Sequence, residues 1–274
     1  MGPRVSQLEN TSVLNKEWVV ADKEIITRAK SYRNRLRSIW ERNSFAEIVN
    51  DLRTIHLKSD LKPHMTPDAY EKVDGILIEA EDHNKVENVV KAYTMTNNFH
   101  QLINTHLANF VNMNNVDDLS LDPGAPAMAY WGGPLDFACI FVNHEELEKY
   151  RPKTNIIVYR GMTIPEEVIR TYRYGIRFMN KTFVSTSTSQ EVALYFAGES
   201  PGFVTCLCIY TLRPGKRRTA LDISSISAVR DESEILILPY STFEVTNVIQ
   251  SNNDQSKLVD FIIELRECHP ETDD

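Results

Sequence analysis

The sequence predicts an α+β protein in which a helical N-terminal half leads into a strand-rich C-terminal half. Apolar residues recur at helical spacing through residues 1–111, and from Asn155 onward short β-branched and aromatic runs predominate. The chain has 274 residues, of which 42% are hydrophobic and 25% are charged. This composition excludes collagen-like, disordered and disulfide-scaffold proteins, and the length allows at most two compact domains.

The first predicted helix carries a basic run. An apolar residue recurs every seven positions from Trp18 to Ile39, which predicts a helix over about residues 14–40. Residues 28–42 contain six Arg or Lys residues and a single acid, Glu41. Such a run is either a solvated helix face or a docking patch for an acidic partner, a membrane or RNA.

The remaining elements follow from apolar period and turn signals. Thr66 as the N-cap and Pro67 at the first helical position predict that a helix begins there. Other helices are expected over residues 45–55, 86–111, 135–150, 165–174 and 191–197. The polar residues 112–126 predict a loop. Strands are expected over residues 156–159, 182–186, 203–212, 234–238, 243–249 and 258–265.

Charge and cysteine content limit the compartment and the partners. The net charge of −8 argues against chain-wide attraction to nucleic acid or anionic lipid. Neither a membrane-spanning apolar run nor a signal peptide is seen, so we expect a cytoplasmic protein or an effector delivered into a host cell. Cys206 and Cys208 lie in an apolar run, and we expect the cysteines to be buried small hydrophobic residues. No metal-ligand spacing is present among the histidines.

Three segments of the strand-rich half carry candidate chemistry. In the first, Arg160 closes an apolar strand and Gly161 follows it, where a glycine allows close approach of a ligand or of another backbone. The guanidinium is a natural fork for an anion. The alternative is a structural salt bridge to a neighbouring acid.

The second segment has five consecutive hydroxyl residues, Ser185 to Ser189, between an apolar strand and a helix. These hydroxyls could orient a carboxylate or a sugar hydroxyl. The alternative is helix capping, because Ser187 or Thr188 would be a suitable N-cap.

The third segment places Glu232 and Glu234 at the mouth of an apolar strand, on the same face if the chain is extended there. Two carboxylates this close suit an oxocarbenium-like transition state, in which one stabilises charge and the other handles a proton. A glycosidase pair is conceivable, although no sugar-binding aromatic platform accompanies it.

Together, the arginine, the Ser185-Thr186-Ser187 run and the Glu232-x-Glu234 pair resemble the signature of the arginine-specific branch of the mono-ADP-ribosyltransferase family. Upstream, Tyr93-Thr94, Phe99, Ile103-Asn104 and Leu107 resemble the helix that covers the dinucleotide in that family. The resemblance implies a catalytic domain over residues 86–270, with two packed, mostly antiparallel sheets and flanking helices. Residues 1–85 would then form a helical region of unknown role.

The resemblance also implies roles for these residues. Arg160 would bind a phosphate of the co-substrate NAD, and the backbone of Gly161 would receive the nicotinamide amide. Ser185 would orient Glu234, which would accept a bond from the ribose 2′-hydroxyl and stabilise the oxocarbenium ion. Glu232 would position and help deprotonate the acceptor guanidinium.

The same resemblance gives three further expectations. Thr186 and Ser187 would shape the site, Phe196 would stack on the nicotinamide, and Tyr93 would line the cleft unless it is a core residue. The implied acceptor is a protein with an accessible arginine, and no metal is required. An NAD glycohydrolase and a non-catalytic scaffold that binds NAD or a partner are the alternatives.

Overall fold

The computed structural model describes residues 18–21, 25–95, 98–113, 132–198, 200–251 and 258–268. The helical elements are α1 (Ile25–Arg42), α2 (Phe45–Asp51), the π-helical η3 (Leu52–Leu61), the 3₁₀ turn η4 (Lys62–His64), α3 (Pro67–Asp82), α4 (Val86–Tyr93), α5 (Phe99–Met113), α6 (Gly132–Asn143), the 3₁₀ helix η7 (Glu145–Tyr150), α7 (Glu166–Ile169) and α8 (Gln190–Tyr195). The strands are β1 (Trp18–Ala21), β2 (Ile156–Pro165), β3 (Arg177–Asn180), β4 (Val184–Ser187), β5 (Phe203–Leu212), β6 (Ala220–Asp222), β7 (Glu234–Ile237), β8 (Thr242–Gln250) and β9 (Phe261–Cys268).

The strands form one sheet with the order β1-β3-β8-β9-β5-β2-β4-β7-β6. Every described neighbouring pair is antiparallel except β5 with β9. Strands β2 and β4 are joined by a single residue pair, Tyr159 with Ser187, so the sheet divides there into a larger and a smaller part. The α+β class with a mostly antiparallel sheet is therefore confirmed, and the two expected sheets correspond to these two parts.

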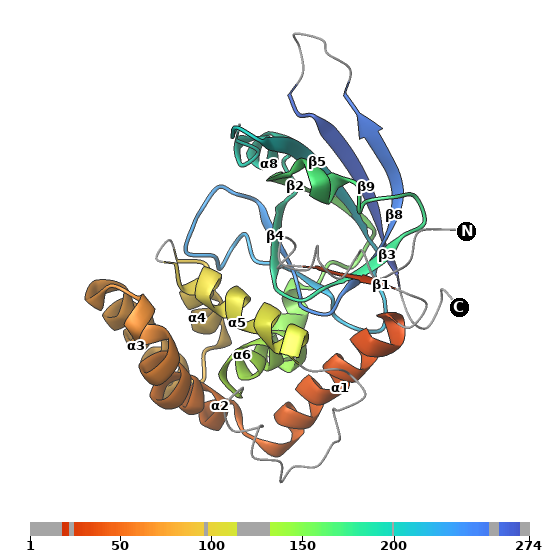
Figure 1. The fold of residues 1–274 in the computed structure, drawn as a ribbon. Coiled ribbons are helices and arrows are strands. Elements are labelled where there is room, and N and C mark those ends of the chain that lie inside the picture. Colours follow the sequence, from red (N-terminus) through yellow and green to blue (C-terminus); the bar gives the residue numbers. More distant parts are fainter. Residues whose placement is uncertain are drawn as a thin grey trace.

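The two parts of the sheet pack on each other through a common apolar core. Val158 and Cys208 from the larger part share this core with Val184 and Ile235 from the smaller part. A second core lies between the sheet and the helices, and it joins residues of α1 to α6 with strand residues such as Leu236. Figure 1 shows helices α1 to α6 gathered on one side of the strands, with α8 beside β2 and β5 on the other.

The first helix is bound to the strand-rich half by ring and polar contacts. The Tyr32 ring stacks on Tyr240 with centroids 4.8 Å apart. Arg33, from the basic run, is buried and donates from Nη2 to Ser241 Oγ at 3.3 Å. The helices before residue 86 therefore share a hydrophobic core with the strands that follow.

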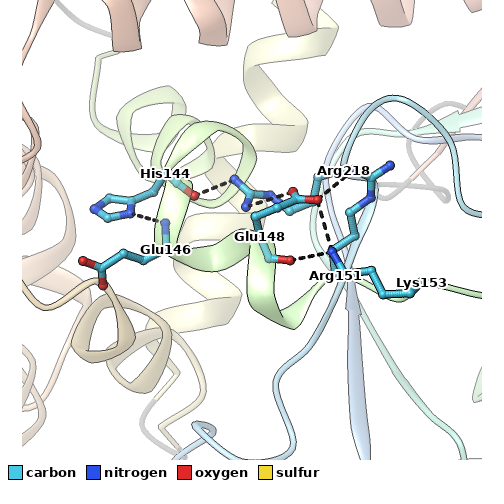
Figure 2. A network of polar contacts seen from close by, with 6 residues as sticks. All are labelled: His144, Glu146, Glu148, Arg151, Lys153 and Arg218. Atoms are coloured by element: carbon cyan, nitrogen blue, oxygen red, sulfur yellow. Dashed lines mark hydrogen bonds and ion pairs between the residues drawn. The ribbon is translucent and has the colours of Figure 1, made fainter.

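A second polar link surrounds the buried Arg218, which precedes β6 (Figure 2). Arg218 donates to the carbonyl oxygen of His144 at 3.0 Å and lies 3.8 Å from a carboxylate oxygen of Glu148. Glu148 also accepts a 2.9 Å hydrogen bond from Arg151. The His144 ring contacts Phe45 at 4.8 Å between centroids, which extends the link to α2.

Several predicted boundaries were wrong. Trp18 lies in β1 rather than in a helix, because residues 18–21 pair with β3. The helix predicted over 86–111 is interrupted between α4 and α5. The helix expected over 165–174 is limited to the short α7. The strand expected over 156–159 is longer than predicted, because β2 continues to Pro165.

Two other predictions, the start of α3 and the state of the cysteines, were confirmed by the structure. Thr66 caps α3 by accepting a hydrogen bond from the Ala69 amide, with Pro67 at the first helical position. The four cysteines are all free and buried. Among the described residues, no helix is long and apolar enough to cross a membrane. The loop predicted over 112–126 lies largely outside the described residues.

Candidate active site

A cavity of about 610 Å³ opens between α4 and α5 on one side and strands β2, β4 and β7 with α8 on the other. All of the residues singled out from the sequence line it, namely Tyr93, Arg160, Gly161, Ser185, Thr186, Ser187, Phe196, Glu232 and Glu234. These residues come from separate segments of the chain. The cavity lies where the single pair between β2 and β4 joins the two parts of the sheet.

Glu234 is the first residue of β7, and its carboxylate is oriented by a serine of the neighbouring strand. Ser187 of β4 pairs directly with Glu234, so Ser185 lies diagonally opposite on the same face of the sheet. Ser185 Oγ donates to Oε1 of Glu234 at 2.6 Å. The register of β4 against β7 thus places the Ser185 hydroxyl at the carboxylate.

Burial raises the pKa of the Glu234 carboxyl, and the nearby charge of Glu232 raises it further. The hydrogen bonds from Ser185 and Ser227 act in the opposite direction, because they stabilise the ionised form. Burial also raises the pKa of the Glu232 carboxyl. The site therefore holds two carboxylates whose proton affinities exceed that of an exposed glutamate.

The segment around Glu232 is not extended, contrary to the sequence prediction. Asp231 and Ser233 have positive φ angles of 71° and 46°, so Glu232 is presented by a turn before β7. Ser187 Oγ donates to the carbonyl oxygen of Glu232 at 2.6 Å. The two carboxylates nevertheless line one cavity, as was expected from the sequence.

The other hydroxyl residues have structural roles in the same region. Thr186 Oγ1 donates to the carbonyl oxygen of Ile235 at 2.6 Å. Ser187 Oγ accepts a hydrogen bond from the Ser189 amide at 3.0 Å. The N-cap of α8 is Ser189 rather than Ser187 or Thr188, because its side chain accepts from the Val192 amide.

Arg160 and Gly161 lie in the middle of β2 rather than at its end. They pair with Cys208 and Leu207 of β5. A Cβ atom at Gly161 would lie 1.9 Å from the carbonyl oxygen of Ala193. Gly161 is therefore required for the close packing of α8 on β2, which forms one wall of the cavity.

The two aromatic candidates differ in exposure. Tyr93 is buried and packs against Phe183, with ring centroids 4.9 Å apart, and its hydroxyl donates to Oδ1 of Asn104 at 3.4 Å. Phe196, at the end of α8, is 56% exposed. Tyr93 is thus a core residue whose edge reaches the cavity, whereas the ring of Phe196 is accessible from solvent.

Sequence reasoning named Asn104 on α5 but missed the rest of the polar face that this helix presents to the cavity. Gln101, Asn104, Thr105 and Ala108 of α5 line the cavity, and their spacing places them on one face of the helix. The Asn104 amide also joins α5 to the strand side, because it donates to the Phe183 carbonyl and accepts from the Phe183 amide, both at 3.3 Å. The signal in the sequence that could have revealed this face is that its residues are small or polar.

The geometry suits cleavage of a glycosidic bond in an anionic substrate. A buried carboxylate can stabilise positive charge that develops on a sugar, and the guanidinium of Arg160 can bind a phosphate. The structure's described residues contain no group of three or more His, Cys, Asp or Glu side chains that could hold a metal ion. The paired carboxylates and the guanidinium are chemically suited to a transferase or a hydrolase that acts on a glycosidic bond.

Comparison with protein families found a match over part of the chain. Residues 143–264 match the ADP-ribosyltransferase exoenzyme family. This range contains every candidate site residue of the strand-rich half. Over this range, the chain is therefore similar to ADP-ribosyltransferase exoenzymes. No curated protein matches the chain.

Solved structures of ADP-ribosyltransferases resemble the chain at low sequence identity. The Vis toxin from Vibrio splendidus is 16% identical, with 92% of this chain and 88% of that chain covered and a TM-score of 0.44. HopU1 of Pseudomonas syringae pv. Tomato DC3000 is 15% identical, with coverages of 71% and 83% and a TM-score of 0.47. The C3 exoenzyme of Clostridium limosum is 18% identical, with coverages of 72% and 95% and a TM-score of 0.45.

Proposed function

We propose that this protein transfers ADP-ribose from NAD to an arginine side chain of an acceptor protein and releases nicotinamide. The observation that supports this proposal best is the pairing of two carboxylates in one cavity, with Glu234 held by Ser185 and Glu232 presented by a turn. One carboxylate is then available for the sugar and the other for the acceptor. We propose that residues 86–270 form the catalytic domain.

The cavity suits NAD in size and in chemistry. Its volume of about 610 Å³ falls in the range of pockets that enclose ligands of this class. Arg160 is the proposed ligand of an NAD phosphate, because a guanidinium offers paired donors to phosphate oxygens. The exposed ring of Phe196 would stack on the nicotinamide, and the backbone of Gly161 would contact its amide. Thr186 and Ser187 hold the strand and the turn that shape this wall.

Glu234 is the proposed catalytic residue for bond cleavage. Its carboxylate would accept a hydrogen bond from the ribose 2′-hydroxyl and stabilise the positive charge that develops as nicotinamide leaves. The bond from Ser185 keeps the carboxylate in one orientation, so little reorganisation is required during the reaction. The burial that raises its pKa also strengthens its interaction with a developing cation.

Glu232 is the proposed residue for the acceptor. A guanidinium is a poor nucleophile while it is protonated, so the acceptor must be oriented and partly deprotonated. Glu232 is less buried than Glu234 and lies on the turn, where an incoming side chain can reach it. Burial raises its pKa, which makes it a better base than an exposed glutamate.

The proposal is tested by incubating the full chain with NAD labelled in its adenine half and with matched acceptors. An arginine analogue should become labelled, whereas a lysine analogue of similar length should not. Nicotinamide release that is independent of any acceptor, with the label recovered as free ADP-ribose and none on the acceptors, would support an NAD glycohydrolase instead. Absence of nicotinamide release, with NAD still bound in calorimetry, would support a binding scaffold.

A further inference from the structure

Ser227 lies in the irregular loop between β6 and β7, and its hydroxyl contacts the second oxygen of the Glu234 carboxylate. Ser227 Oγ donates to Oε2 at 3.3 Å, whereas Ser185 Oγ donates to Oε1 at 2.6 Å. Each carboxylate oxygen therefore has its own serine donor. No periodic pattern in the sequence indicates Ser227, because the loop has neither helical nor strand spacing.

The same hydroxyl is connected to the shape of the loop. Ser227 Oγ accepts a hydrogen bond from the Val229 amide at 3.2 Å, and Val229 lines the cavity. A serine hydroxyl has one proton and two lone pairs, so it can donate to Glu234 and accept from Val229 at once. Both bonds can form only while the loop keeps this turn.

The next residue of the loop is anchored to the helical layer. The Ala228 amide donates to Thr94 Oγ1 at 2.8 Å, across a separation of 134 residues in the chain. Thr94 directly follows α4, and its hydroxyl lies 3.2 Å from the Val90 carbonyl oxygen. The loop that carries Ser227 is thus attached to α4 at one residue and to Glu234 at its neighbour.

We infer that Ser227 is a positioning residue for Glu234, and that the bond from Ala228 to Thr94 holds Ser227 in place. The inference rests on the proposed function, in which Glu234 is the catalytic carboxylate. Ser227 acts through the carboxylate: with Ser185 it limits rotation of the carboxylate about its last side-chain bond. Loss of either donor would leave one oxygen without its serine partner.

Several charged or titratable groups face Glu234 across the cavity. They are Glu232 from the loop, Tyr159 and Arg160 from β2, Tyr93 from α4 and His100 from α5. Among the causes that shift the pKa of Glu234, burial is the largest, and the Ser227 hydrogen bond lowers the pKa. Removal of this hydroxyl should therefore raise the pKa of Glu234, because the ionised form loses a donor.

The activity test compares Ser227→Ala with Ser227→Thr, which keeps the hydroxyl. We expect Ser227→Ala to lower kcat for nicotinamide release about tenfold and to leave KM for NAD nearly unchanged. The acid limb of its pH profile should move up by about half to one pH unit, and Ser227→Thr should restore it. Ser224→Ala is the matched control, since Ser224 Oγ donates to Asp222 at 2.6 Å. An unchanged profile in Ser227→Ala, or an equal shift in the control, would overturn the inference.

A second measurement does not depend on activity. In protein labelled with ¹³C at glutamate carboxyls, the Glu234 signal is assigned by its loss in Glu234→Gln and is then titrated. We expect Ser227→Ala to raise the pKa of Glu234. Thr94→Val removes the hydroxyl that accepts from the Ala228 amide and should also raise this pKa, whereas Thr94→Ser keeps the hydroxyl and should leave it unchanged. Equal titration curves for all variants would overturn the inference. If the unmodified protein releases no nicotinamide, the proposed function fails, but this titration still decides the role of Ser227.

Discussion

Ser185 and Glu234 lie 49 residues apart in the chain, yet Ser185 Oγ donates to Glu234 Oε1 at 2.6 Å. The bond is set by the register of β4 and β7, in which Ser187 pairs with Glu234. A slip of one residue would turn Ser185 to the opposite face of the sheet. The catalytic geometry proposed here is thus maintained by the backbone hydrogen bonds of the smaller part of the sheet.

Replacement of Glu234 by glutamine should abolish the reaction, since the amide keeps the size of the side chain and removes its charge. We expect kcat for nicotinamide release and for transfer to fall at least ~10²-fold, with a folded protein. Glu166→Gln, on an exposed residue at the start of α7, is the matched control. Near-normal turnover of Glu234→Gln would contradict the proposed mechanism.

Replacement of Glu232 by glutamine should separate transfer from hydrolysis. Water needs less positioning than a guanidinium, so Glu232→Gln should lose about 10²-fold in labelling of an arginine analogue and keep most of its nicotinamide release. Both activities are measured on the same purified variant. Equal loss of the two would place Glu232 in the bond-breaking step or in the stability of the turn.

Replacement of Arg160 by alanine should chiefly weaken NAD binding. Loss of a charge-assisted contact to a phosphate predicts a KM for NAD that is about tenfold higher, with a smaller change in kcat. Calorimetric titration with NAD checks this directly, and Arg170→Ala, on an exposed residue, is the control. If KM is unchanged in a folded variant, Arg160 forms a structural salt bridge instead.

Replacement of Gly161 by alanine should displace α8, because the new Cβ would lie 1.9 Å from the Ala193 carbonyl oxygen. Overpacking of this kind predicts a loss of about 1–3 kcal/mol in the free energy of unfolding. Gly198→Ala is the control, since no atom lies within 4 Å of a Cβ atom there. Thermal unfolding of both variants measures the difference, and an equal Tm for the two would contradict the tight packing of α8 on β2.

Replacement of Asp136 by asparagine should change how stability depends on pH. Burial, with a contribution from the charge of Asp51, raises the pKa of Asp136 to about 7. The native state then binds a proton more tightly than the unfolded state, whose pKa is about 3.9. Stability from this group is therefore present at low pH and is lost as the pH rises from about 4 to about 7.

In Asp136→Asn this loss is absent. We therefore expect the difference in the free energy of unfolding between the variant and the native protein to shift in favour of the variant by roughly 1–3 kcal/mol from pH 4 to pH 8. Thermal unfolding at both pH values gives the comparison. Asp82→Asn, on an exposed residue at the end of α3, is the matched control. A stability difference between Asp136→Asn and the native protein that is independent of pH would contradict the raised pKa.

Local signals were sufficient for much of the fold and for the choice of candidate residues. The strand predicted over 203–212 coincides with β5, because a long run of β-branched and aromatic residues suits only a buried strand. The start of α3 at Pro67 follows from its cap and from the fixed φ of proline. The carboxylates and the hydroxyl run were recognisable because their side-chain chemistry is present in the sequence itself.

Contacts between distant segments decided the rest. Trp18 fits a helical spacing in the sequence, but the backbone of residues 18–21 pairs with β3, and that partner lies about 160 residues away. The role of Ser227 depends on a loop whose anchor, Thr94, belongs to another layer. Local propensities are worth only tenths of a kcal/mol per residue, whereas burial and hydrogen bonding to remote segments outweigh them. The sequence alone therefore determined which chemical groups are available, and the tertiary structure alone determined which of them meet.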